Sequence, residues 1–162
     1  MIRTIQDFTD RWQEESDNTI KVFRHLTDAS LAQQCPGGRT IGRLANHIVE
    51  TLTELPHAMG LPIEEEHVTY TTVDSLIEAY KKHAAHLVDV VKQNLTDEKL
   101  NEEKNMYGEN WKNGFSLWVT LTHQAHHRAQ MTVLMRFAGL TVPGVYGPSS
   151  DDWKSWGKEP LA

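Results

Sequence analysis

The sequence predicts an all-α fold, a four-helix bundle that ends in a short irregular C-terminal tail. Glycine and proline gather at a few breaks, and the long segments between the breaks carry apolar residues three and four positions apart. This spacing places apolar side chains on one face of a helix. Alternating patterns typical of strands are weak throughout. Four long helices with short or moderate connections are typical of a bundle.

Length and composition limit the classes of protein. The chain has 162 residues and no shift in composition, so we expect a single domain over residues 1–162. Its one cysteine, Cys35, excludes an internal disulfide and a cysteine-built metal site. The net charge of −6 disfavours nucleic acid as a partner. Neither a transmembrane run nor a signal peptide is evident, so we expect a cytoplasmic protein without a membrane partner.

The first two helices are predicted over about residues 4–34 and from residue 41 onward. The first has one apolar stripe with a polar gap at residues 14–17, formed by Ile5, Phe8, Trp12, Ile20, Phe23 and Leu31. Thr40 is a suitable N-cap for the second. That helix has the most regular spacing, at Ile41, Leu44, Ile48, Leu52, Leu55 and Met59. Pro56 should kink the helix or end it early.

The third and fourth helices are predicted over about residues 72–95 and 115–138. The third has apolar positions at Val73, Leu76, Ile77, Tyr80, Ala84, Leu87, Val88 and Val91. The fourth should stop at Gly139, because glycine suits the residue after a helix C-terminus. The tail over residues 140–162 is rich in glycine, proline and serine and contains Trp153 and Trp156.

The fourth predicted helix carries the main chemical motif, LTHQAHHRAQM. His123 and His127 are four residues apart, so both side chains lie on one face, one turn apart. This spacing suits two imidazoles that share one metal ion, as in the H-E-x-x-H motif of zinc enzymes, although the glutamate of that motif is missing. His126 is the second choice as the partner of His123.

The histidine pair lies on the more apolar arc of this helix. The same arc holds Val119, Met131, Leu134 and Phe137, whereas Gln124 and Arg128 lie well off it. Two inward imidazoles need polar partners, because an unpaired buried polar group costs about 1–3 kcal/mol. A metal ion is one such partner, and a backbone carbonyl, a carboxylate or water is the alternative.

A third ligand is offered by His47 in the second helix, beside the apolar stripe at Leu44 and Ile48. The pattern alone also fits a histidine at the boundary of the core. The remaining histidines have weaker claims: His25, His57, His67, His83 and His86. Charged neighbours at positions 81, 82 and 89 indicate that His83 and His86 face solvent.

Two motifs together resemble the DinB-like (damage-inducible B) family, part of the bacillithiol-transferase and mycothiol-dependent maleylpyruvate isomerase superfamily. They are Leu44-Ala45-Asn46-His47-Ile48 and His123-Gln124-Ala125-His126-His127-Arg128-Ala129-Gln130. Gly139-Leu140 and the stretch from Pro143 to Gly147 also look similar. Ala129 departs from the family's usual glycine but is still small enough for close helix packing.

The resemblance implies that His47, His123 and His127 bind one divalent metal ion and leave positions open for water or a substrate. Imidazole ligands suit zinc or nickel. The better-understood relatives activate water or a low-molecular-weight thiol, such as bacillithiol, for hydrolysis or transfer. Three neutral imidazoles leave the full charge on the ion, which lowers the pKa of bound water to about 7 and holds a thiol as thiolate.

We therefore expect a metal-dependent thiol S-transferase or hydrolase with a small-molecule substrate. The alternative is a non-catalytic metal-binding or stress-related interaction bundle. His126 is a candidate base only if it faces the cavity, and Glu50 or Glu54 is a candidate for orienting a ligand. Because Cys35 lies far along the chain from the histidine pair, we expect any reacting thiol to arrive with a cofactor.

The resemblance also implies a homodimer. The fourth helix has a second, partly apolar face, formed by Leu117, Trp118, Leu121, Ala125 and Thr132. This face would pack either on another subunit or on the first helix.

Overall fold

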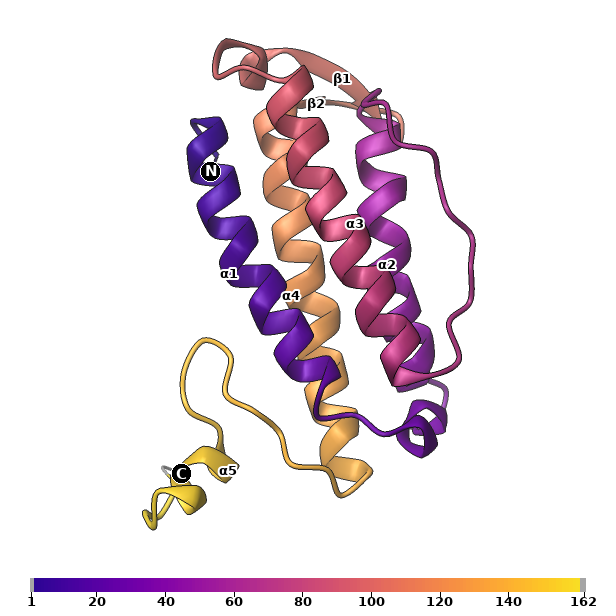
Figure 1. Cartoon of the computed structure of the whole chain (residues 1–162), viewed down its shortest axis with the longest axis vertical. Coiled ribbons are helices and arrows are strands. Elements are labelled where there is room, and N and C mark those ends of the chain that lie inside the picture. The colour runs from indigo at the N-terminus through magenta and orange to yellow at the C-terminus, as the bar shows by residue number, and fades with distance from the viewer. Residues whose placement is uncertain (1, 161–162) are drawn as a thin grey trace.

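The computed structural model describes residues 2–160 and confirms the four-helix bundle (Figure 1). The elements are, in chain order, α1 (Ile5–Phe23), the 3-10 helix η1 (Asp28–Ala32), α2 (Ile41–Ala58), α3 (Val73–Asn94), the 3-10 helix η2 (Glu98–Asn101), β1 (Glu103–Met106), β2 (Glu109–Lys112), α4 (Asn113–Phe137) and α5 (Ser150–Ser155). Within residues 2–160, no helix is both long enough and apolar enough to cross a membrane.

The four long helices are not packed in chain order. α1 and α2 each pack against both α3 and α4, so α1 lies diagonally across the bundle from α2. α2 and α3 run in the same direction, and the segment over residues 60–72 returns along the length of the bundle to connect them (Figure 1). This order makes α2 and α4 neighbours, which brings the two histidine motifs to one interface.

α2 forms as its sequence predicts. The Thr40 hydroxyl accepts a hydrogen bond from the Arg43 backbone N–H at 3.0 Å, which caps the helix. The predicted apolar stripe is buried along its whole length, at Ile41, Leu44, Ile48, Leu52, Leu55 and Met59. Pro56 lies in the last turn, and the helix ends soon after it, at Ala58.

The prediction that the first helix continues to residue 34 is wrong. α1 ends at Phe23, and a separate 3-10 helix follows. The Thr27 hydroxyl accepts a hydrogen bond from Ser30 N–H at 3.2 Å, and Ser30 Oγ accepts one from Thr27 N–H at 3.0 Å. Such local side-chain bonds compete with helix continuation. The apolar spacing predicted a continuous helix because Leu26 and Leu31, on either side of the break, still pack against the core.

The hairpin β1–β2 was not predicted. Its turn consists of Tyr107 and Gly108, which have φ angles of 55° and 89°. Positive φ at both turn residues is required in a type I′ turn, where Asn-Gly is the usual pair. Tyrosine rarely adopts this conformation, so Tyr-Gly is a weak hairpin signal. Met106, at the end of β1, is fully buried.

The polar face of α4 is buried, although we placed it off the core-facing arc. Arg128 is only 2% exposed, and its guanidinium donates to Glu15 Oε2 at 2.5 Å and to Thr19 Oγ1 at 2.9 Å. Gln124 is fully buried and accepts a hydrogen bond from the Tyr80 hydroxyl at 2.6 Å. α4 therefore has one face that carries histidines and a second, buried face whose polar groups bond to α1 and α3, although the amide nitrogen of Gln124 has no hydrogen-bond partner within residues 2–160.

The expected second apolar face of α4 is buried only in part: Leu117 and Leu121 are buried, whereas Trp118 is 40% exposed. The other exposed large apolar side chains of α4 are Phe115, Val133 and Phe137. The placement of Phe137 on an inward arc is therefore wrong. The homodimer stays a prediction.

The tail is irregular apart from α5, and polar contacts fasten it to the bundle. Asp152 Oδ2 accepts hydrogen bonds from the backbone N–H groups of Gly144 and Ser149 at 2.9 and 2.8 Å. The Lys21 ammonium donates to the Gly144 carbonyl at 2.7 Å. Arg128 donates to the Tyr146 hydroxyl at 2.6 Å. The segment after α4 is thus held against α1.

We expect Arg128→Met to lower the free energy of unfolding by about 3 kcal/mol, because it leaves the Glu15 carboxylate without its buried partner. Urea denaturation measures this loss. In the double variant Arg128→Met/Glu15→Gln the loss should be smaller than the sum of the two single losses. Arg11→Met, which removes an exposed ion pair with Glu14, is the control and should change stability by less than about 1 kcal/mol.

Candidate metal centre

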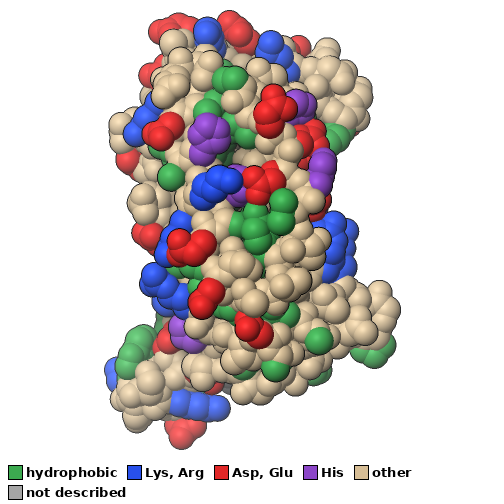
Figure 2. Space-filling view, turned by 45° about the vertical axis from the view of Figure 1, so that its right-hand side comes forward, with side chains coloured by type: hydrophobic (Ala, Val, Ile, Leu, Met, Phe, Trp, Pro, Cys, Tyr) green, Lys and Arg blue, Asp and Glu red, His purple; other side chains and the backbone are tan. Residues whose placement is uncertain are grey.

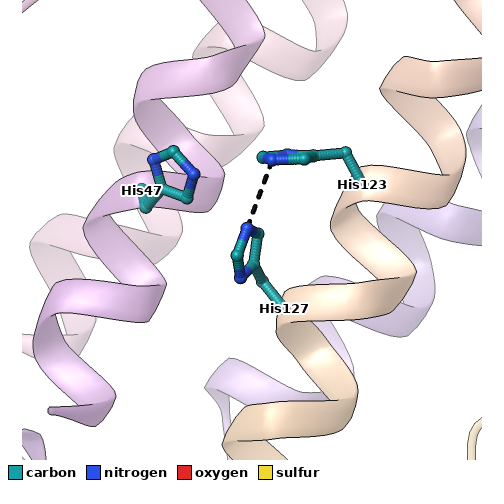
Figure 3. Close-up of side chains that lie close together, drawn as sticks. All are labelled: His47, His123 and His127. Carbon is teal, nitrogen blue, oxygen red and sulfur yellow. Dashed lines mark hydrogen bonds between the residues drawn. The ribbon is translucent and has the colours of Figure 1, made fainter. Parts of the chain in front are cut away.

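Three histidine side chains converge between α2 and α4. His47 projects from α2 toward His123 and His127 on α4 (Figure 3). One ring nitrogen of each lies within 4.8 Å of the corresponding nitrogens of the other two. The Nε2 atoms of His123 and His127 are 3.2 Å apart. The structure thus brings together the three residues that the sequence singled out.

Gln130 sets the tautomer of His127. Its amide oxygen lies 2.8 Å from His127 Nδ1. An amide oxygen only accepts hydrogen bonds, so Nδ1 carries the proton and Nε2 keeps a free lone pair toward the other imidazoles. The amide nitrogen of Gln130 lies 3.2 Å from His126 Nε2 and donates to it. Sequence reasoning did not assign this role to Gln130.

Glu50 stands in a similar relation to His47. Its carboxylate lies 3.5 Å from His47 Nδ1 and also pairs with Arg43 at 3.1 Å. Burial acts to raise the pKa of Glu50, but hydrogen bonds and charge from Arg43 and His47 outweigh it and lower the pKa below its usual value. The carboxylate is therefore ionised and accepts from Nδ1. Glu54, the other candidate, instead accepts a hydrogen bond from the Tyr107 hydroxyl at 3.0 Å.

The imidazoles of His123 and His127 are neutral at physiological pH. Burial lowers the pKa of His123 to about 4, and the neighbouring His127 and His47 and the charge of Arg39 act in the same direction. Burial likewise lowers the pKa of His127, against the opposing effect of its bond to Gln130. Neutral imidazole is the form that binds metal ions.

His126 lies beside the three histidines but outside their group. It is exposed, and its ring centre is 4.8 Å from that of His127. On the face drawn in Figure 2, histidine side chains lie among acidic and basic ones. His83 differs from our expectation of a solvated side chain, because it is buried with Nε2 3.3 Å from Glu66 Oε1. The segment before α3 folds over it and supplies that carboxylate.

A cleft of about 540 Å³ opens beside the three histidines. It is lined by Cys35, Gly37, Gly38, Arg39, Leu44, His126, His127, Gln130, Val133, Leu134 and Phe137. Although Cys35 lies far along the chain from the histidine pair, the turn before α2 folds back so that Cys35 lines the same cleft as His127. Arg39, another cleft residue, was not identified from the sequence, since nothing local marks an arginine before an N-cap as part of a site.

The donor set fits a metal ion. Zinc binds histidine nitrogen at about 2.0–2.1 Å, so two nitrogens on one tetrahedral ion lie about 3.3 Å apart. The Nε2 atoms of His123 and His127 are separated by 3.2 Å, which matches this value. Within residues 2–160, the buried Nδ1 of His123 has no hydrogen-bond partner. The same separation also suits a hydrogen bond from His123 Nε2 to the lone pair of His127 Nε2 (Figure 3), so a bound ion would take the place of that proton.

Comparison with known proteins agrees with this geometry. The sequence profile of the DinB family matches residues 1–160. The chain belongs to the DinB family. YrdA, an uncharacterized protein of Bacillus subtilis (strain 168), is 37% identical to it over 163 residues, which cover 98% of each chain.

Solved DinB-like structures share the fold. A DinB-like protein from Bacillus cereus ATCC 10987 is 39% identical, with a TM-score of 0.84 over 90% of this chain and 100% of that one. YfiT from Bacillus subtilis has 14% identity and a TM-score of 0.64, over 83% of this chain and 87% of its own. YfiT is described as a probable metal-dependent hydrolase with an unusual four-helix bundle topology, and at this identity the likeness concerns the fold alone.

The lowered pKa of His123 predicts how the stability of the metal-free DinB chain depends on pH. The unfolded chain protonates this histidine at about pH 6.5, whereas the folded chain does so only near 4. Stability is therefore complete above about pH 6.5 and falls as the pH drops toward 4. Urea denaturation in EDTA at about pH 7.5 and pH 5 should show this loss. His123→Asn should reduce it, while His86→Asn on the exposed side of α3 should not. Equal losses in all three proteins would contradict the assignment.

Proposed function

We propose that His47, His123 and His127 bind one divalent metal ion and that the protein is a metal-dependent enzyme. The convergence of three imidazoles, two of them with lowered pKa values, at the side of a cleft carries this proposal. Gln130 and Glu50 hold the Nδ1 protons of two ligands, which leaves Nε2 of each free to bind. Nitrogen donors of this kind suit zinc or nickel.

The number of ligands supports catalysis over a structural role. Structural zinc sites are closed by four protein ligands, whereas catalytic sites use three and keep one position for water or substrate. The group here has three histidines, and His127 also lines the cleft. A ligand in the cleft would therefore lie beside the ion. The description of YfiT as a probable metal-dependent hydrolase supports the same class of function.

The chemistry we propose is activation of water or a small thiol for attack on an electrophile. A bound divalent ion supplies Lewis acidity, which lowers the pKa of such a nucleophile toward neutrality. Among residues 2–160, the side chains that line the cleft include the thiol of Cys35 but no carboxylate and no hydroxyl, so a nucleophile other than that thiol would come from solvent or from a cofactor such as bacillithiol. His126 faces the cleft and is placed to accept a proton.

Metal analysis of tag-free protein tests whether the three histidines bind one metal ion. We expect about one ion per chain in the unchanged protein and a large loss in His47→Ala and His127→Ala, because each removes a ligand. His86→Ala, which removes an exposed histidine on α3, should retain the ion. Full occupancy in the ligand variants would contradict the assignment.

The same proteins test the reaction. Assays of ester hydrolysis, and of conjugation of bacillithiol or glutathione to a chlorodinitrobenzene, should show turnover that disappears in His47→Ala and persists in His86→Ala. Activity with water alone indicates a hydrolase, and activity only with thiol indicates an S-transferase. Stoichiometric metal without either activity would favour the non-catalytic metal-binding bundle.

Gln130→Ala should weaken metal affinity about tenfold to a hundredfold, because His127 then loses the acceptor that fixes its Nδ1 proton. Gln130→Glu keeps an acceptor oxygen at the same position and should retain affinity near that of the unchanged protein. Competition with a chromogenic chelator measures both. Equal affinities in Gln130→Ala and the unchanged protein would show that Gln130 does not position His127.

A further inference from the structure

The cleft beside the histidines contains one side chain with a full positive charge, that of Arg39. Arg39 is exposed, and within residues 2–160 it forms no ion pair, unlike the arginines at positions 11, 43, 128 and 136. Arg39 lines the same cleft as His127, one of the proposed metal ligands. Arg39 is therefore an unpaired cation within electrostatic reach of the proposed metal centre.

The surroundings of Arg39 favour an anion. None of the residues that line the cleft is acidic, although the whole chain carries a net charge of −6. Arg39 directly precedes the N-cap of α2, and the first turn of this helix also lacks acidic residues. The positive end of the helix dipole thus adds to the guanidinium charge. A planar guanidinium matches a carboxylate in geometry, because it can form two parallel hydrogen bonds to it.

The cleft lining also has an apolar part. Val133 and Phe137 on α4 are 56% and 68% exposed, and they line the cleft together with the buried side chains of Leu44 and Leu134. Exposed large apolar groups at a cleft are typical of ligand-binding surfaces. The volume of about 540 Å³ lies within the range of small-molecule sites, about 300–1,000 Å³.

We propose that this cleft binds a small amphiphilic carboxylate, with Arg39 holding the carboxylate and Val133 and Phe137 contacting the apolar part. The inference that this ligand is the substrate rests on the proposed metal-dependent function. The inference that the cleft binds it does not. One cation favours one anionic group over a polyphosphate or a nucleic acid backbone. Arg39 is in this proposal a residue that determines specificity, and it takes no part in the reaction.

The test measures binding of two probes, octanoate and the neutral octanamide, to the full chain by isothermal titration calorimetry, both with metal and in EDTA. Octanoate should bind about tenfold more tightly than octanamide in both conditions, because the charge-assisted bond to Arg39 does not need the ion. Arg39→Gln should abolish this preference, and Arg39→Lys should restore part of it. Arg24→Gln, which removes the exposed arginine at the C-cap of α1 and outside the cleft lining, should leave the preference unchanged.

The apolar contact is tested with Phe137→Ser, which should weaken both probes about equally and leave the preference for octanoate intact. Sedimentation equilibrium of the same variant tests whether a second subunit packs on Phe137 instead. A change in oligomeric state with unchanged probe binding would show that Phe137 serves a subunit contact, which would overturn the apolar part of the proposal.

Two further results would overturn the proposal. Equal affinity for octanoate and octanamide would show that the cleft does not select an anion. A preference that requires the metal and survives Arg39→Gln would show that the ion holds the carboxylate. If the protein binds no metal but still prefers octanoate, carboxylate binding in the cleft is supported while the proposed metal-dependent function is refuted. Failure of one proposal can thus be distinguished from failure of the other.

Discussion

The buried pairing of Arg128 with Glu15 constrains the orientation of α4, and the site depends on that orientation. Consecutive residues of a helix point about 100° apart, so a helix that directs Arg128 toward α1 must direct His127 toward another neighbour. The packing order makes that neighbour α2, which carries His47. A buried ion pair contributes little net stability because desolvation offsets its attraction, but breaking it is costly. The contact therefore selects one rotation of α4 over others, and this rotation brings the imidazoles together.

Electrostatics near the site differ from those of the molecule as a whole. The chain is acidic, yet among residues 2–160 the cleft lining holds Arg39 without an ion-pair partner and no carboxylate. Glu50, whose carboxylate contacts His47, also forms an ion pair with Arg43. Burial and nearby positive charge lower the pKa values of His123 and His127, so both imidazoles are neutral and their lone pairs are available. This arrangement of charges is the basis for proposing both a metal ion at the histidines and a carboxylate ligand at Arg39.

Elements set by local contacts were predictable. The apolar stripe of α2, its cap at Thr40 and the stop of α4 before Gly139 all depend on residues within a few positions, and the structure has each of them. Predictions failed where a local contact was atypical or a distant one intervened. The Tyr107-Gly108 turn uses an unusual residue pair, and the Thr27–Ser30 capping box interrupts a helix whose apolar spacing continues past it. His83 is buried because a distant loop covers it with Glu66.

The sequence by itself determined that His123 and His127 share one helix face, because helical periodicity fixes the direction of residues four apart. It also determined which residues of α2 are buried. Only the tertiary structure decided that His47 meets this pair, that Cys35 and Arg39 line the same cleft, and that Arg128 and Gln124 are buried. These contacts join segments distant in the chain, so they depend on the order in which the helices pack and on the rotation of each about its axis. Neither is encoded in local spacing.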